Sequence, residues 1–188
     1  EDSMKKIASS GVGGAGYSGA KEVRERGPEA EIHVYSDTDL GPYNPMLTTY
    51  YVKGAIPYDA MFPFGSLEEA AGRLGLKVHT NTPVTALDPE SKTLTLAGGT
   101  KAQYDGILIS TGASAVMPPI PGLDLPGVFK MRTVEDAVEL KKALDGGQIK
   151  SGLVIGASWV GIKIVEDLVE RGSPCTLVDG AAWICYVA

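Results

Sequence analysis

The same pattern occurs twice in this sequence: a short apolar run, a glycine-rich turn, a helix-like segment, a second apolar run and an acidic residue. The first copy spans residues 6–37 and the second spans residues 152–179. The periods of the apolar residues predict two strands in each copy, joined by helices over about residues 17–26 and 162–171. Because a strand, a helix and a parallel strand form the unit of an α/β sheet, this repeat largely decides the fold class.

The glycine-rich turn of the first copy consists of Gly11, Val12, Gly13, Gly14, Ala15 and Gly16. A turn without side chains lets backbone N–H groups and the helix dipole reach the pyrophosphate of a dinucleotide. Chance matches to this spacing are common in a chain with 24 glycines, so the inference rests on the place of the turn between a strand and a helix. Asp37, 21 residues after Gly16, stands near the spacing expected of a residue that binds the ribose hydroxyls.

The turn of the second copy is less regular and consists of Gly156, Ala157, Ser158, Trp159, Val160 and Gly161. Ser158 replaces the middle glycine and places a side chain where the backbone would meet phosphate. Asp179 follows Gly161 by 18 residues, and an acidic side chain there repels the 2′-phosphate of NADP(H). The second turn therefore predicts a dinucleotide site that favours NAD(H) over NADP(H), with a turn that holds no ligand as the alternative.

The segments around the two copies complete an α/β fold. Residues 76–79 are expected to form a third parallel strand, and residues 84–110 an antiparallel meander with turns at Asp-Pro and Gly-Gly pairs. Residues 107–109 then return as a buried strand. The prolines of residues 118–126 exclude a helix or a central strand and mark a boundary, after which residues 133–144 have helical spacing. Ser9 and Ser10 in the first apolar run predict loose packing of that strand.

Composition limits the classes of partner. Acidic side chains outnumber basic ones by 23 to 17, which gives a net charge of −6 and argues against nucleic acid. Charged residues make up 21% and hydrophobic residues 44%, which is typical of a soluble chain and excludes a membrane partner. The two cysteines are too few for a disulphide framework, and nothing resembles a signal peptide, so we expect a cytoplasmic protein.

Several conspicuous residues have structural explanations. Cys175 opens an apolar run and is expected to pack in the core, and His33 and His79 lie on expected strands as packed or edge histidines. Tyr17 and Lys21 match the Y-x-x-x-K spacing of short-chain dehydrogenases. Because both follow the phosphate turn on a helix, they are too far from a nicotinamide ring for that chemistry.

Two glycine turns, separated by a meander, a Thr-Gly-Ala turn and a proline-rich linker, resemble the FAD-dependent pyridine nucleotide-disulphide oxidoreductase superfamily. Within it, the chain is most similar to the branch of NADH oxidases and ferredoxin reductases. The resemblance implies a Rossmann-like FAD-binding domain with a β-meander over residues 4–112. It also implies a linker and helix over 113–150 and an incomplete NAD(P)-binding domain over 151–188, which is a truncated second βαβ unit.

The resemblance assigns site residues by position. Residues 11–16 would hold the FAD pyrophosphate, Ser36 or Asp37 the adenosine ribose, and Val84 the adenine through its backbone. The resemblance also places two segments near the flavin, the Thr-Gly-Ala turn and a loop that ends at Thr49. The residues assigned there are Thr111, Gly112, Ala113, Pro45, Thr48 and Thr49.

Two departures from that branch bear on the acceptor. Its members place a lysine or a redox cysteine near the position of Thr49, and commonly a glutamate where this chain has Lys163. The missing thiol argues against a disulphide acceptor, and leaves oxygen or a small redox protein open. No side chain stands out as a catalytic acid, base or nucleophile, which suits hydride transfer between stacked rings.

The expected function is transfer of a hydride from NAD(P)H to FAD and onward to an acceptor. The superfamily continues beyond the second unit with a return to the FAD domain and a dimerisation domain, whereas this sequence ends nine residues after Asp179. We therefore expect a truncated chain that is completed by a second copy or a complementing chain. The alternative is a non-catalytic dinucleotide-binding fragment with an incomplete flavin site.

Overall fold

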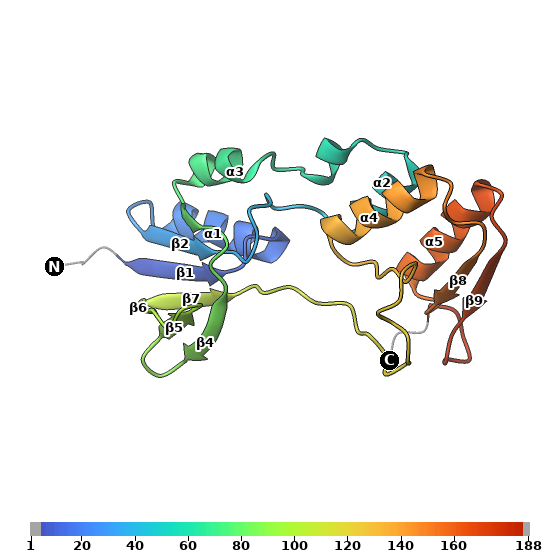
Figure 1. Ribbon diagram of the computed structural model, residues 1–188. Helices are drawn as coiled ribbons and strands as arrows, with labels where there is room; N and C mark the ends of the chain where they lie inside the picture. Colours follow the sequence, from blue (N-terminus) through green and yellow to red (C-terminus); the bar gives the residue numbers. More distant parts are fainter. Residues whose placement is uncertain (1–4, 186–188) are drawn as a thin grey trace. The chain divides into compact units, whose positions relative to one another are not determined.

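The computed structural model describes residues 5–185, which separate into two units (Figure 1). The first unit contains residues 5–44 and 62–113, and the second contains residues 45–61 and 114–185. The division into 4–112, 113–150 and 151–188 stays a prediction, and its outer ends at residue 4 and at residues 186–188 lie outside the described residues. The grouping of residues 45–61 with the second unit has no counterpart in the sequence analysis.

A four-stranded parallel sheet with the order β3-β2-β1-β7 forms the centre of the first unit. Along β2, Ile32 and Val34 face the helices, whereas Tyr35 packs beneath the meander, because successive side chains of a strand point to opposite faces. The parallel strands predicted from the first copy and from residues 76–79 are confirmed. The elements are β1 (Lys6–Ser10), α1 (Gly14–Arg26), β2 (Glu31–Tyr35), α3 (Leu67–Leu74), β3 (Lys77–His79) and β7 (Gly106–Ile109).

The serines at the end of β1 are tightly packed. Ser9 and Ser10 are only 2% and 8% exposed. The Ser9 hydroxyl donates to the carbonyl of Gly11 at 2.9 Å and lies 2.9 Å from the Ser110 hydroxyl, which in turn donates to the Ser10 carbonyl. At β1 the prediction of loose packing is therefore wrong, because hydrogen-bond partners inside the protein offset the cost of removing a hydroxyl from water.

The meander covers the other face of the sheet. It consists of β4 (Val84–Asp88), β5 (Thr93–Leu96) and β6 (Lys101–Gln103), which pair antiparallel as predicted. Leu94 and Leu96 pack with Ala8 and Tyr35 of the parallel sheet, and the phenol oxygens of Tyr35 and Tyr104 lie 2.5 Å apart. The meander and the helices thus enclose the parallel sheet from both sides.

The strand β7 differs from its prediction as a buried strand. It pairs with β1 alone, at the edge of the sheet. Ile107 packs against the meander cluster, but Ile109 is 65% exposed. The edge position explains the difference, because a terminal strand has a neighbour on one side only.

The second unit packs three helices beside a two-stranded parallel sheet. Its core contains Val52, Leu140 and Leu168, one from each helix. The partly buried Cys175 packs against the same cluster, as expected. The elements are α2 (Leu47–Lys53), the 3-10 helix η1 (Tyr58–Met61), α4 (Val134–Asp145), β8 (Gly152–Ile155), α5 (Trp159–Glu170) and β9 (Cys175–Val178).

Several boundaries differ from the sequence expectations. Helices α1 and α5 begin three residues earlier than expected, because the ends of both glycine turns already adopt helical geometry. Thr48 and Thr49, which the resemblance places in a loop, lie in α2, which is followed by Gly54 in the left-handed conformation with φ +84°. Helix α4 begins after Thr133, whose hydroxyl accepts from the N–H of Asp136 in a capping box.

None of the helices within residues 5–185 is long and apolar enough to cross a membrane.

The hydroxyl cluster of β1 generates a first prediction. Replacing Ser110→Ala should lower the free energy of unfolding by about 1 to 2 kcal/mol, because the Ser9 hydroxyl and two backbone carbonyls lose a buried partner. Urea unfolding measures this loss. The exposed Ser114 provides the control, and a Ser114→Ala variant should unfold like the parent chain. Equal stability of the two variants would contradict the role of the cluster.

Candidate functional site

The first glycine turn joins the end of β1 to the start of α1. Gly11 adopts φ +110°, and its N–H donates to the carbonyl of Tyr35 at 2.8 Å. A Cβ added at Gly16 would overlap the carbonyl oxygen of Gly11, so the helix packs against the turn at glycine-only distance. At Gly13 and Gly14, by contrast, an added Cβ meets no atom within 4 Å. This open side at the amino end of α1 gives an anion access to backbone N–H groups.

The second turn repeats this geometry between β8 and α5. Gly156 adopts φ +107°, and its N–H donates to the carbonyl of Val178 at 2.8 Å. A Cβ at Gly161 would overlap the Gly156 carbonyl oxygen. The two copies therefore share a first glycine at positive φ and a third glycine that leaves no room for a Cβ.

Ser158 takes the place of the middle glycine without changing the backbone. Its φ and ψ are −74° and 173°, against −57° and −173° at Gly13. The Ser158 side chain caps α5 by accepting from the N–H of Gly161 at 3.4 Å. The hydroxyl that the sequence places in the path of phosphate is thus turned toward its own helix.

The other members of the turns differ in exposure. Val12 and Ala157 are buried, whereas Ala15 is exposed and Trp159 and Val160 are 73% and 41% exposed. Tyr17 is buried and its ring packs on Phe64 at a centroid distance of 4.5 Å. This burial supports the exclusion of the dehydrogenase-like role for Tyr17.

Asp179 folds back onto the second turn. Its carboxylate accepts from the backbone N–H groups of Ala157 and Ala181. These two hydrogen bonds hold the pKa of Asp179 below its ordinary value, because they stabilise the ionised form. The ionised Asp179 carboxylate is thus held against the backbone of the second turn.

The corresponding residues of the first turn have no such contact with it. Ser36 is 5% exposed, and its hydroxyl accepts from the N–H of Thr38 at 3.2 Å. Asp37 is exposed. The backbone of Ser36 is held on both sides, since its N–H donates to the carbonyl of His79 and its carbonyl accepts from Thr82.

The remaining predicted positions of the first unit lie at the carboxyl edge of the same sheet. The exposed turn Thr111–Ala113 follows β7, with Gly112 at φ +70°. Val84 is half-buried where β4 begins, two residues after Thr82. The structure therefore gathers the glycine turn, Ser36, Asp37 and these two segments at one edge, which is where open α/β sheets bind ligands.

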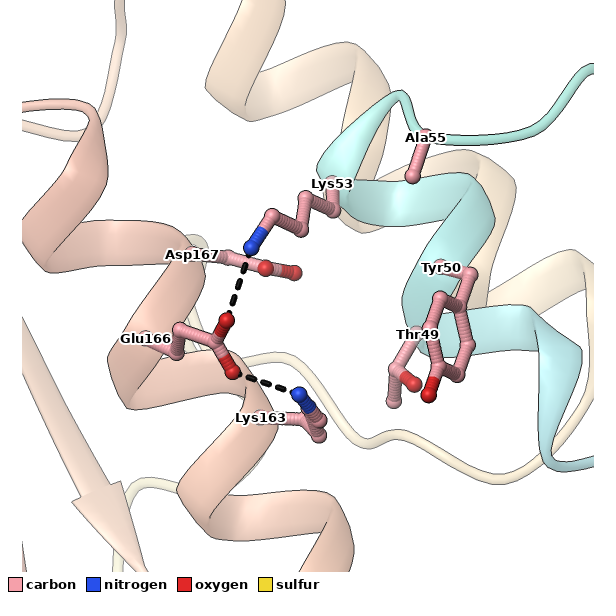
Figure 2. Close-up of a pocket in the computed structure, with 7 residues that line it drawn as sticks. All are labelled: Thr49, Tyr50, Lys53, Ala55, Lys163, Glu166 and Asp167. Carbon is pink, nitrogen blue, oxygen red and sulfur yellow. Dashed lines mark hydrogen bonds and ion pairs between the residues drawn. The ribbon is translucent and has the colours of Figure 1, made fainter.

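In the second unit, a cavity of about 280 Å³ lies between α2 and α5 (Figure 2). It is lined by Thr49, Tyr50, Lys53, Ala55, Lys163, Glu166 and Asp167. Thr48, also on α2, is buried, and its hydroxyl donates to the Pro45 carbonyl at 2.7 Å. Thr49 similarly donates to the carbonyl of Met46 at 3.4 Å.

Charge pairs line one side of this cavity. Lys53 lies 2.7 Å from Glu166, and Lys163 lies 2.6 Å from the other oxygen of Glu166 (Figure 2). Lys53 also lies 2.8 Å from Glu170. Hydrogen bonds from Lys163 and Lys53 lower the pKa of Glu166 to about 2, and the same contacts raise the pKa of both lysines. The ammonium of Lys163 also lies 5.7 Å from the centre of the Tyr50 ring. All three groups therefore stay ionised at neutral pH.

Asp167 lies beside this network but takes no part in it. It is 2% exposed, and among residues 5–185 neither of its carboxylate oxygens has a hydrogen-bond partner. Burial raises its pKa to about 6. Sequence reasoning missed this residue, although a signal was present: Asp167 falls three residues after Ile164 and directly before Leu168, on the apolar stripe of α5.

Within residues 5–185, the structure brings together no group of three or more metal-binding side chains at a spacing that could hold a metal ion.

A family model described as "Pyridine nucleotide-disulphide oxidoreductase" matches residues 9–188. The NADH oxidase of Enterococcus faecalis is 32% identical over 181 residues, which cover 93% of this chain and 40% of the relative. The chain thus spans well under half the length of this curated relative.

Solved structures give the same result. The water-forming NADH oxidase of Lactobacillus brevis bound to NADH has a TM-score of 0.88 and 28% identity, over 96% of this chain and 41% of the other. Its engineered water-forming NADPH oxidase form, bound to NADPH, has a TM-score of 0.87 and 27% identity, over 96% and 40%.

The glycine contacts predict unequal effects of alanine. Gly16→Ala should destabilise the chain by about 3 kcal/mol, because its Cβ has to displace the Gly11 carbonyl. Gly14→Ala lies two residues away, meets nothing and should be neutral or stabilising by up to about 1 kcal/mol. Thermal unfolding of both variants distinguishes them, and similar melting temperatures would refute the close contact.

The buried carboxyl of Asp167 predicts a pH-dependent penalty. Its folded pKa of about 6 exceeds the ordinary 3.8, so the unfolded chain ionises first and stability falls as pH rises from about 4 to 6. Asp167→Ala should therefore raise the free energy of unfolding by about 2 kcal/mol at pH 7 and by little near pH 4.

Urea unfolding at both pH values measures this difference. An Asp124→Ala variant is the control, since Asp124 is exposed in the same unit. A gain from Asp167→Ala that is the same at both pH values would show that packing, and not charge, is responsible.

Proposed function

The chain belongs to the pyridine nucleotide-disulphide oxidoreductase family, and we propose that it forms the FAD-binding part and the start of the NAD(P)H-binding part of a flavin-dependent oxidoreductase. The observation that carries this proposal is the repeated turn geometry, with open space beside Gly13 at a helix amino end. FAD, when bound, accepts a hydride from the nicotinamide and passes the electrons to an acceptor. The protein's own residues bind and orient the two nucleotides.

The first turn fits the pyrophosphate of FAD. Residues 11–16 present backbone N–H groups at the start of α1, and the dipole of the helix favours the negative charge. Ser36 or Asp37 would bind the adenosine ribose, and Val84 the adenine through its backbone. Six further residues would lie beside the flavin, as the family resemblance implies: Thr111, Gly112, Ala113, Pro45, Thr48 and Thr49.

The second turn, residues 156–161, would bind the pyrophosphate of the nicotinamide nucleotide, and Asp179 supports a preference for NADH. The engineered NADPH oxidase carries five substitutions, among them a glycine and an aspartate 18 positions later, both replaced by alanine. Asp179 stands at the same interval after Gly161. Its fixed carboxylate would repel a 2′-phosphate and accept a hydrogen bond from a 2′-hydroxyl.

The acceptor is oxygen or a small redox protein. Thr49 supplies a hydroxyl that is bonded to the Met46 carbonyl, and a hydroxyl does not perform thiol exchange. The name of the Enterococcus relative, an NADH oxidase, favours oxygen.

An absorbance spectrum of the purified chain after incubation with FAD tests the proposal. We expect flavin bands near about 370 and 450 nm that bleach when NADH is added without oxygen. A chain that stays colourless would refute FAD binding and favour the non-catalytic fragment. A flavin that NADH does not bleach would limit the function of this chain to FAD binding.

Two variants localise the binding. Gly13→Val should lower FAD affinity by at least about tenfold, because a side chain at this position extends from a Cβ that lies in the open space where the proposal places the phosphate. Gly72→Ala is the matched control, since Gly72 is exposed on α3 and also meets nothing within 4 Å. Calorimetric titration with FAD measures both, and equal affinities would remove the first turn from the site.

A further inference from the structure

The only two histidines of the chain are paired on the meander-side face of the parallel sheet. His33 on β2 and His79 on β3 have nearly parallel rings, 7° apart, with centroids separated by 5.2 Å. His33 Nδ1 lies 2.9 Å from His79 Nε2, which is hydrogen-bond distance. For this hydrogen bond to form, one of the two facing nitrogens must carry a proton and the other must be an unprotonated acceptor.

The charged neighbours of the pair fix its protons. His33 Nε2 lies 2.6 Å from a carboxylate oxygen of Glu31, and Lys77 lies 2.9 Å from the same oxygen. These two contacts lower the pKa of Glu31 to about 2, with a smaller contribution from Lys6 on β1. The ionised Glu31 is therefore an acceptor for a proton on His33 Nε2.

The uncharged side of the pair consists of tyrosines. The ring of Tyr35 stacks on His79 at 4.5 Å, and the ring of Tyr104 lies 5.4 Å from His33. Burial raises the pKa of Tyr104 far above the range in which histidine titrates. Histidine is thus the residue type in this cluster whose ordinary pKa lies between pH 5 and 8.

The hydrogen bond between the two histidines depends on how many protons the pair carries. With both rings neutral, His79 Nε2–H donates to His33 Nδ1. With one added proton, His33 donates to Glu31 and to His79. A second proton puts an N–H on both facing nitrogens, so the hydrogen bond is lost and two positive rings are left in contact.

The structure opposes that second proton. Burial, followed by the charges of His33 and Lys77, lowers the pKa of His79 below 6.5. The folded chain therefore binds fewer protons than the unfolded chain just below pH 6.5, and the free energy of unfolding falls as pH decreases from there.

The pair is connected to the first nucleotide site through the backbone. The His79 carbonyl accepts from Ser36 N–H at 3.0 Å, and the Ser36 carbonyl accepts from Thr82 N–H at 2.8 Å. His79 is the last residue of β3, an edge strand of only three residues. A change at this histidine pair therefore acts directly on the segment that carries Ser36 and Asp37.

We propose that His33 and His79 are positioning residues for the nucleotide at the first turn, and that double protonation of the pair releases β3 and weakens binding of the adenosine half. The inference rests on the proposed function of that turn. It gives the site a pH dependence that comes from the protein alone, because the diphosphate of FAD does not titrate between pH 5 and 8.

The test compares the parent chain with His79→Gln. Glutamine places an amide donor near the position of His79 Nε2 but does not take up a proton. Calorimetric titration with FAD should show affinity about tenfold weaker at pH 5.5 than at pH 7.5 for the parent, and a change of less than about twofold for His79→Gln. The same pH dependence in both chains would overturn the proposal.

Two controls test whether the pH dependence of FAD affinity comes from the histidine pair or from another group. Asp167 titrates in the same range in the second unit, so Asp167→Asn should keep the pH dependence of the parent. NMR of the two imidazoles follows the protonation of the pair directly, since the chain holds no other histidine. An Asp167→Asn chain with pH-independent affinity would assign the effect to Asp167 and refute the histidine pair.

Hydrogen exchange of backbone amides tests the effect of the histidine pair without FAD. After correction for intrinsic rates, the N–H groups of Ser36 and Thr82 should exchange faster at pH 5.5 than at pH 7.5 in the parent but not in His79→Gln. If FAD fails to bind at pH 7.5, the proposed function fails, and exchange alone decides whether the pair holds this segment. Unchanged exchange would overturn the inference even where FAD binds.

Discussion

The close approach of a helix to a glycine carbonyl is the contact on which the geometry of both glycine turns depends. In each copy the third glycine leaves no room for a Cβ, so the first turn of the helix lies directly against the strand end. The helix amino terminus therefore lies at the edge of the sheet, where its backbone N–H groups can face an anion. In the second copy two N–H groups of the turn already have partners, since the Ser158 side chain accepts from Gly161 and the Asp179 carboxylate accepts from Ala157. Gly13 and Ser158 share one backbone conformation because this contact, and not the middle residue, sets the path of the chain.

The second unit shows a different balance between charge and burial. Lys53 on α2 forms ion pairs with two glutamates of α5. Asp167 on α5 is buried, and within residues 5–185 its carboxylate has no hydrogen-bond partner. An ionised carboxylate in such a place is costly, and its pKa rises in response. An unpaired buried carboxyl beside a cavity is the type of group that functional sites retain despite its effect on stability.

Periodicity predicted most of the fold. The parallel strands, the meander and the helix after Thr133 follow from apolar spacing and turn residues, which are local properties. Helix α2 escaped prediction because its stability comes from packing Val52 against the other helices of its unit, which no local pattern reveals. The packing of Ser9 escaped for the same reason, since its partner Ser110 lies 101 residues away. Of the candidate site, the glycine turns were visible in the sequence, but the cavity and the histidine pair were not.

The sequence by itself determined the repeated strand, turn and helix, the residues of both turns and the family, because glycine spacing and hydrophobic period are written along the chain. The tertiary structure alone decided which distant groups meet: Asp179 with the N–H of Ala157, Lys53 with Glu166, and His33 with His79. These contacts join residues from separate elements, and their distances depend on how strands are ordered and helices are packed. The charge states of these side chains follow from those contacts, since a pKa depends on neighbours that the linear order does not specify.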